Sequence, residues 1–440
     1  MNNGRLVVAL AILAALVAAV PLAAAHNDRS GHGKRGGEVV GYFTSWGIYG
    51  RQYRVKDVAT SGSADKLTAI NYAFANLLPD SEPGDVVCKL GDEWADYQTS
   101  WTAEQSVTGE EVTWPRPILG NFQQLQALKA LHPNVKVLIS LGGWTWSQHF
   151  SDAALTPDSR ERFVESCIDL FIKGNLPDPG WGGMGGPGAA AGVFDGIDID
   201  WEWPASEGHP QNVVRPQDKR NFTLLLEEFR DQLDEYGEET GEDYLLTAFL
   251  PAAPAKIKAG FEVDEIFESL DFATVQGYDL HGAWEPLTNH QSNLYKSRRD
   301  PTSPRFSVNN TVKAYLRRGA PRRELVVGVP FYSRGWTGVA STGDGLFAPS
   351  TGAAPGTWEP GAEDYKVAKG LLEQGFTRYW DRKTQAAWLF DGTTFWTFDD
   401  PQVMRDKASY VRKNRLGGLM FWELSGDTPD GELITALADG

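Results

Sequence analysis

The chain has 440 residues and a formal net charge of −17, with 58 Asp and Glu against 41 Lys and Arg. This acidic balance argues against nucleic acid as a partner, because phosphate backbones need patches of Lys and Arg. Sixteen Trp residues are present, and since a buried indole N–H needs a hydrogen-bond partner, we expect some of them on an open surface.

The first 25 residues indicate export. Arg5 precedes an apolar run from Leu6 to Leu22, and Ala23-Ala24-Ala25 supplies the small residues that a signal peptidase requires. We therefore expect a signal peptide at residues 1–25 and a secreted, extracellular protein. An uncleaved membrane anchor is the alternative, because the run approaches the ~17–18 residues that can span a bilayer. Residues 26–37 are polar and glycine-rich and predict a disordered lead.

From Glu38 onward, short apolar runs alternate with amphipathic helical patterns. The runs predict strands at 39–43, 69–75, 135–141, 194–201, 245–250, 272–278, 325–331 and 416–422. The patterns predict helices at 122–131, 160–172, 218–233, 308–316 and 403–414. This alternation implies a parallel sheet, and eight strands close a (β/α)8 barrel. An open doubly wound sheet is the alternative, but Thr44-Ser45-Trp46-Gly47 after the first strand is not its glycine-rich phosphate loop.

Two long stretches interrupt the alternation. Residues 77–117 follow strand 2, and residues 335–400 follow strand 7. The second stretch predicts a helix near 365–372 and strands near 376–380, 386–390 and 395–398. Both emerge at the C-terminal face, where barrel enzymes keep their active sites. The expected fold is thus an α/β protein, a (β/α)8 TIM barrel over 38–440, with a small α+β insertion domain at 335–400 between strand 7 and its helix.

Cys88 and Cys167 are the two cysteines of the chain. Export permits a disulfide, but two cysteines far apart in sequence give no framework. Cys167 shares a side of its helical pattern with Phe163 and Phe171, which favours a buried apolar thiol. We make no prediction that the two are joined.

The run from Phe194 to Pro204 carries the strongest chemical signal. Successive side chains of a strand point to opposite faces. Asp198, Asp200 and Glu202 therefore share one face, while Ile197, Ile199 and Trp201 share the other. If the apolar set packs beneath the helices, the carboxylates point into the barrel and climb toward its C-terminal mouth. Burial and like-charged neighbours there raise carboxyl pKa values by up to ~3–5 units, which suits proton transfer.

Two other interpretations of this strand agree less well with the sequence. A metal site would need His or further carboxylates on neighbouring strands, and those strands are mostly apolar. A solvated acidic strand would not carry isoleucines on its opposite face. No metal or cofactor is therefore expected.

These residues also resemble a known family. Residues 195–202 match the DGxDxDxE signature of the family 18 glycoside hydrolases, the chitinases. Further segments resemble that family's motifs in the right order: Ser140-Leu141-Gly142-Gly143-Trp144, Tyr278-Asp279 with Gly282 and Trp284, Pro330-Phe331-Tyr332-Ser333-Arg334, and Gly418-Leu419-Met420-Phe421-Trp422-Glu423. The resemblance covers the chain from about Glu38 to its C-terminus and is to a bacterial, secreted chitinase.

The resemblance implies retaining hydrolysis of β-1,4-linked N-acetylglucosamine polymers. In this family the substrate's own 2-acetamido group is the nucleophile. Glu202 would then be the general acid and base, and Asp200 would orient the acetamide N–H. Asp198 would share a proton with Asp200, and Tyr278 would hold the acetamide oxygen.

The resemblance also implies a substrate cleft. Trp422 would form its floor, and the other positions expected along it are Asp279, Arg334, Trp144, Trp284, Tyr42 and Gln276. Many family members carry Met where this chain has Gln276. An amide there can hydrogen-bond where a thioether cannot, so the fit of the bound sugar is expected to differ.

Three rival functions share this catalytic strand. Two are enzymes: an endo-β-N-acetylglucosaminidase acting on glycoproteins, and a peptidoglycan hydrolase. The insertion favours a chitinase over both, because it resembles the wall that deepens the cleft in one chitinase subfamily. The third is a non-catalytic chitin-binding lectin, but such relatives typically lose the acid that Glu202 supplies. The expected partner is chitin or its oligosaccharides, bound by a monomer.

Overall fold

Eight parallel strands close into a barrel in the computed structural model, which describes Met1 and residues 37–80, 85–340 and 343–440. The barrel strands are β1 (Glu38–Thr44), β2 (Ala69–Pro79), β4 (Lys136–Gly142), β5 (Gly196–Asp200), β6 (Leu245–Leu250), β7 (Phe272–Val275), β8 (Leu325–Pro330) and β15 (Gly418–Trp422). They follow one another in chain order, and β1 pairs with both β2 and β15, which closes the sheet. The predicted barrel is confirmed. Residues 2–36, which hold all of the predicted signal peptide and lead except Met1 and Gly37, lie outside the described residues.

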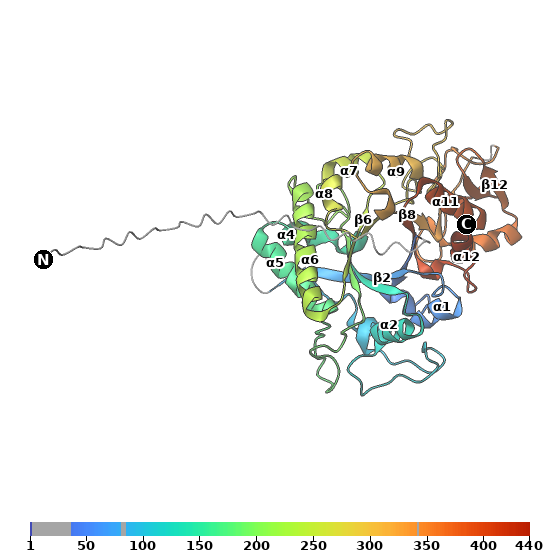
Figure 1. Ribbon diagram of the computed structural model, residues 1–440. Coiled ribbons are helices and arrows are strands. Elements are labelled where there is room, and N and C mark those ends of the chain that lie inside the picture. The colour runs from blue at the N-terminus through green and yellow to red at the C-terminus, as the bar shows by residue number, and fades with distance from the viewer. Residues whose placement is uncertain (2–36, 81–84, 341–342) are drawn as a thin grey trace. The chain divides into compact units, whose positions relative to one another are not determined.

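Helices surround the barrel on all sides of the view in Figure 1. They are α1 (Val55–Thr60), α2 (Gly120–Leu131), α3 (Gly143–Trp146), α4 (Phe150–Ala153), α5 (Pro157–Cys167), α6 (Asp218–Thr240), α7 (Pro254–Gly260), α8 (Val263–Ile266), α9 (Val308–Leu316), α11 (Pro401–Asn414) and α12 (Glu432–Asp439). All five predicted helices are among them. The others have 4 to 8 residues, too short to show a helical period in sequence.

Local sequence sets the ends of the longer helices. At the start of α5, the Thr156 side chain accepts the Ser159 N–H at 3.1 Å, and at the start of α11 the Asp400 carboxylate accepts the Val403 N–H at 3.0 Å. Each bond satisfies a donor that the first helical turn leaves free. Helix α6 ends at Gly241, whose φ of 75° lies in the left-handed region that glycine adopts without cost.

The α+β insertion domain between β8 and α11 is also confirmed. It comprises β9 (Tyr332–Thr337), β10 (Gly352–Ala353), β11 (Ala362–Asp364), α10 (Tyr365–Gly370), β12 (Thr377–Asp381), β13 (Ala386–Phe390) and β14 (Phe395–Phe398). Its sheet runs β10-β9-β14-β13-β12, with β11 on β9. Strand period two divides its side chains: Ala387 and Leu389 join the barrel core, while Trp388 and Phe390 form a separate core with Trp336. The insertion is thereby fixed on the barrel.

A disulfide joins Cys88 to Cys167, with 5.0 Å between their Cα atoms. The interpretation of Cys167 as a free thiol was therefore wrong, although its burial is confirmed. Strand β2 continues into a hairpin with β3 (Val86–Lys89), which places Cys88 against the end of α5. The Cys88 N–H donates to the Ser166 hydroxyl at 3.0 Å across the same contact. Sequence offered no sign of this hairpin, so the pairing could not be predicted.

Removing this disulfide is expected to destabilise the protein. It closes a loop across a sequence separation of 79 residues, and such a constraint on the unfolded chain typically contributes about 2–4 kcal/mol. The double variant Cys88→Ala with Cys167→Ala should therefore unfold at lower temperature, as should the reduced wild type. Calorimetry of oxidised, reduced and double-variant protein checks this. Equal unfolding temperatures for all three would contradict it.

Candidate active site

The three carboxylates lie in a line that rises out of the barrel. Asp198 and Asp200 are on β5, and Glu202 follows two residues beyond the end of that strand. The side chains of the opposite face, Ile197, Ile199 and Trp201, are buried in the core. Asp198 is completely buried, Asp200 is 4% exposed and Glu202 is partly exposed. The strand period thus places the carboxylates as the sequence predicted.

Asp198, at the bottom of the line, is held by hydroxyl groups from three other strands. Its Oδ2 accepts Tyr42 Oη at 2.9 Å and Ser140 Oγ at 2.7 Å, and its Oδ1 accepts Thr247 Oγ1 at 2.6 Å. Burial raises the pKa of Asp198, and these hydrogen bonds oppose the rise. No hydrogen bond joins Asp198 to Asp200 here, so the proton they would share stays a prediction.

Asp200 occupies the middle of the line with an unpaired oxygen. Its Oδ1 is buried and has no hydrogen-bond partner among the described residues. Burial raises the pKa of Asp200 well above its usual value, and the charges of Glu202 and Asp198 raise it further. A buried carboxyl oxygen without a partner is costly, and a ligand with an N–H donor would satisfy it.

Glu202 reaches the mouth of the barrel in a form suited to donate a proton. Burial raises its pKa to about 8; the Lys256 ammonium opposes the rise and Asp279 adds to it. At neutral pH most Glu202 side chains therefore carry a proton. A protonated carboxyl with a pKa near the working pH is an efficient general acid.

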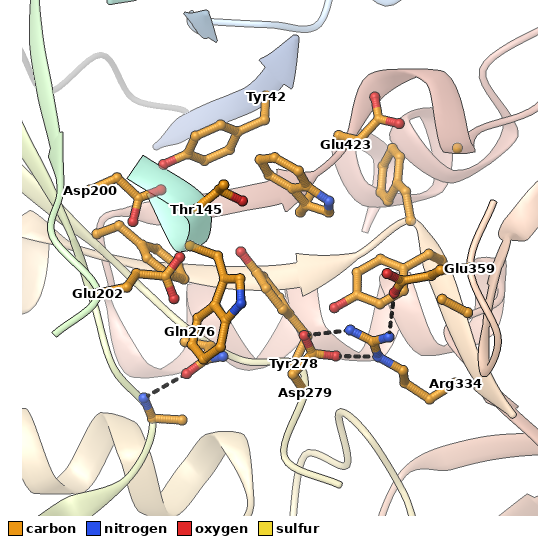
Figure 2. Close-up of a pocket in the computed structure, with 18 of the residues that line it drawn as sticks. Tyr42, Thr145, Asp200, Glu202, Gln276, Tyr278, Asp279, Arg334, Glu359 and Glu423 are labelled. Atoms are coloured by element: carbon orange, nitrogen blue, oxygen red, sulfur yellow. Dashed lines mark hydrogen bonds and ion pairs between the residues drawn. The ribbon is translucent and has the colours of Figure 1, made fainter. Parts of the chain in front are cut away.

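The carboxylates open into a cleft of about 1100 Å³ at the C-terminal face. Every predicted site residue except Asp198 lines it: Tyr42, Trp144, Asp200, Glu202, Gln276, Tyr278, Asp279, Trp284, Arg334 and Trp422. Figure 2 shows Glu202 and Tyr278 turned toward the same space. Residues from β1, β5, β15 and the insertion thus meet in one place, as the family resemblance implied.

Trp422 lies against aromatic rings on this cleft. Its ring stacks on Phe74, with 5.7 Å between centroids and 15° between planes, and tilts against Tyr42 at 5.2 Å. Flat aromatic surfaces of this kind suit the apolar faces of sugar rings. Trp144 and Trp284 are 49% and 61% exposed along the same cleft, so part of the high Trp count does lie on an open surface.

Arg334, on β9 of the insertion, forms ion pairs with residues of both the barrel and the insertion. Its guanidinium binds Asp279 through two hydrogen bonds of 2.7 and 2.9 Å and Glu359 through one of 2.9 Å, and it lies 5.3 Å over the Trp284 ring. Figure 2 shows this network beside Tyr278. Arg334 and Asp279 therefore pair with each other at the edge of the cleft.

Gln276 and Tyr278 follow β7, which ends at Val275. The Gln276 Oε1 accepts the Ala252 N–H at 3.2 Å. Because a backbone N–H can only donate, this bond fixes the amide orientation and leaves Nε2 as the donor that Gln276 offers to the cleft (Figure 2). The Tyr278 ring stacks on Phe249 at 6.1 Å and 18°, which holds the phenol in place.

Comparison with known proteins places this site in a family. Residues 38–427 match the family model described as glycosyl hydrolases family 18. The chain belongs to glycosyl hydrolases family 18. It is 37% identical over 425 residues to chitinase A1 of Niallia circulans and 38% identical over 427 residues to chitinase C of Streptomyces lividans. These alignments cover 89% and 94% of this chain, but only 56% and 61% of the two relatives.

A solved structure is similar over almost the whole fold. The catalytic domain of psychrophilic chitinase B from Arthrobacter TAD20 superposes with a TM-score of 0.87 at 46% identity, covering 92% of this chain and 95% of that one. The family resemblance found in the sequence motifs is thereby confirmed. Among its described residues, no group of three or more His, Cys, Asp or Glu side chains is arranged to hold a metal ion.

Sequence reasoning missed several residues of this family 18 cleft. They include Trp46, Phe74, Lys256, Trp358, Glu359 and Glu423. Glu423 follows β15 directly and Trp46 lies two residues beyond the end of β1, and that position is a signal that could have suggested them. Trp358 comes from the insertion, where it lies against Arg51 with 4.7 Å between guanidinium and ring. No sequence pattern marks a contact of that kind.

Proposed function

We propose that the chain is a chitinase, which hydrolyses β-1,4-linked N-acetylglucosamine polymers with retention at the anomeric carbon. The protonated Glu202 donates its proton to the glycosidic oxygen. The carbonyl oxygen of the substrate's 2-acetamido group attacks the anomeric carbon as the leaving sugar departs, forming an oxazolinium ion. Glu202 then takes a proton from the water that opens this ion. Retention follows because the anomeric carbon is inverted twice.

Asp200 and Tyr278 assist the acetamido group in this scheme. The unpaired Asp200 Oδ1 accepts the acetamide N–H and stabilises the positive charge of the oxazolinium ion. The Tyr278 hydroxyl donates to the acetamide oxygen and holds it for attack. The proposal rests above all on one arrangement: Glu202 lines the cleft, and two residues before it on the same face of the strand lies Asp200, whose buried Oδ1 lacks a hydrogen-bond partner. Burial raises the pKa of Glu202 to about 8, which suits a proton donor.

Chitin as the substrate and export of the protein are parts of the same proposal. The two curated relatives and the solved structure are named chitinases, and the open cleft lined by exposed Trp residues suits an extended polysaccharide. Export rests on residues 1–25, of which only Met1 lies in the described part. Within that part, no helix has the length and apolar character needed to cross a bilayer.

Product analysis tests this function. Colloidal chitin, glycoprotein glycans and cell-wall sacculi are incubated with the protein, and release of reducing ends is compared. We expect release from chitin; activity on only the other two substrates would favour the rival hydrolases, and binding without cleavage would favour a lectin. With an N-acetylglucosamine hexamer, NMR should show the β-anomer first. An α-anomer as the first product would contradict the retaining mechanism.

The amide of Gln276 gives a second testable expectation. Its Nε2 donor faces the cleft, so it should donate a hydrogen bond to an acceptor on the acetylated sugar. The same donor should disfavour binding of the positively charged amine of a deacetylated sugar. Gln276→Glu keeps the shape but replaces the donor by oxygen. This change is expected to lower kcat/KM on the fully acetylated hexamer by ~10-fold, the effect of one lost hydrogen bond. It should also raise the relative rate on partially deacetylated substrate.

Gln276→Met serves as the matched control, because it removes the donor without adding a charge. It should show the loss on the acetylated hexamer without the gain on deacetylated substrate. Steady-state rates on the two substrates measure both effects. If neither variant changes the ratio of the rates on the acetylated and deacetylated substrates, the Gln276 amide does not contact the substrate.

A further inference from the structure

Glu202 lies beyond the last residues of β5 that pair with the neighbouring strands. The pairing of β5 with β4 ends at Asp200, opposite Gly142, and its pairing with β6 ends at Ile199, opposite Ala248. The backbone N–H and C=O of Glu202 therefore have no partner in the sheet. A general acid must nevertheless be placed closely against the oxygen it protonates. Something other than the sheet has to fix it.

The N–H of Glu202 is bound by a serine side chain. Glu202 N donates to Ser147 Oγ at 2.9 Å. The Ser147 hydroxyl in turn lies 2.8 Å from the Gly143 carbonyl and 3.1 Å from the Asp200 carbonyl. Ser147 is completely buried, so no water competes for these bonds. One side chain thus joins the backbone on both sides of Trp201 to the segment that follows β4.

The C=O of Glu202 is bound by an asparagine from the loop at 205–217. Asn212 Nδ2 donates to this oxygen at 2.7 Å. The loop lies so close to it that a Cβ on Gly208 would be 2.0 Å from the same atom. The two segments also meet, because Val213 N donates to the Gln148 carbonyl at 3.1 Å. Both polar groups of the Glu202 backbone are therefore held by connected segments outside the sheet.

We propose that Ser147 and Asn212 are positioning residues, which form a two-sided clamp on the Glu202 backbone and fix the general acid against the glycosidic oxygen. This inference rests on the proposed hydrolysis, because it assumes that Glu202 donates the proton. Neither residue touches the carboxyl group, so each acts through the backbone. Loss of either bond lets the Glu202 peptide rotate and moves the carboxyl away from its target.

Leaving groups of different basicity test the clamp. Departure of an N-acetylglucosamine unit needs a proton from Glu202, whereas departure of 2,4-dinitrophenolate does not. Ser147→Ala and Asn212→Asp are compared with wild type on a chitin tetramer and on the dinitrophenyl glycoside of chitobiose. We expect kcat/KM on the tetramer to fall by ~10- to 100-fold, the cost of a misplaced acid. On the dinitrophenyl substrate we expect less than about a threefold fall, since the acid is not needed there.

Controls separate this proposal from simpler explanations. Ser106 is as fully buried as Ser147 but bonds to Thr108, far in sequence from the carboxylates, so Ser106→Ala should match wild type on both substrates. Asn212→Asp lies on a partly exposed loop and keeps the side-chain size, so it provides a folded variant even if Ser147→Ala does not fold. Equal losses on both substrates would overturn the clamp, as would no loss on either. If wild type itself cleaves neither, the proposed hydrolysis fails instead.

Discussion

Replacing Glu202 by glutamine is expected to lower kcat on N-acetylglucosamine oligomers by ~10²–10⁴, the contribution of a general acid. Glutamine keeps the shape of the side chain but has no proton to give and cannot later accept one from water. Oligomer binding should remain close to wild type, because the aromatic surface around Trp422 is unchanged. Calorimetric titration and initial rates measure the two quantities separately.

The pH profile links this loss to the ionisation of Glu202. Its pKa in the folded protein is raised to about 8 by burial, and the protonated form is the active one. Wild-type kcat/KM should therefore fall as pH rises through about 8. The residual kcat/KM of Glu202→Gln should not show this fall. Glu207→Gln, an exposed position five residues away, is the matched control and should keep both rate and profile. Near-normal turnover of Glu202→Gln would remove Glu202 from the acid's role.

Much of the fold could be predicted because its signals are local. The run 194–201 shows period-two alternation of carboxylates and apolar residues, and the observed strand β5 carries them on opposite faces. The line of three carboxylates follows from that alternation together with burial of one face. The ten predicted residues that line the cleft were placed there by the resemblance to family 18 motifs, and they lie together because the carboxyl ends of parallel strands meet at one face of a barrel.

Contacts between distant segments could not be predicted in this way. Thr247 and Ser140 bind Asp198 because β4 and β6 flank β5. The sequence does not distinguish a strand hydroxyl that binds a carboxylate from one that only packs against its neighbours. The Cys88–Cys167 bond depends on a hairpin within a polar stretch. The clamp on Glu202 depends on two loops. In each case the partner is set by tertiary packing, which the local pattern does not encode.

Asp200→Asn is expected to change activity and stability in opposite directions. Burial keeps Asp200 protonated in the free enzyme, and in the proposed mechanism it passes this proton to Asp198 as the oxazolinium ion forms beside it, so that its carboxylate stabilises the positive charge. Asparagine keeps an oxygen for the acetamide N–H but cannot ionise in this way. Loss of such electrostatic stabilisation typically costs ~10²–10³ in kcat. The rate on a chitin oligomer measures this effect. A structural aspartate would instead show reduced stability together with reduced activity.

The stability change follows from the pKa of Asp200. Burial raises this pKa well above that of the unfolded chain, and neighbouring carboxylates add to the rise. The native state therefore holds a proton that the unfolded state releases, so the wild-type carboxyl lowers the free energy of unfolding as pH rises above its unfolded pKa. Asparagine does not titrate and avoids this cost. Asp200→Asn should consequently unfold at a higher temperature than wild type at pH 7, and the difference should shrink toward pH 4. An Asp200→Asn variant that is less stable than wild type at pH 7 would show that the buried Asp200 side chain stabilises the fold. The unpaired Asp200 Oδ1 would then not be explained by binding of the substrate's acetamido group.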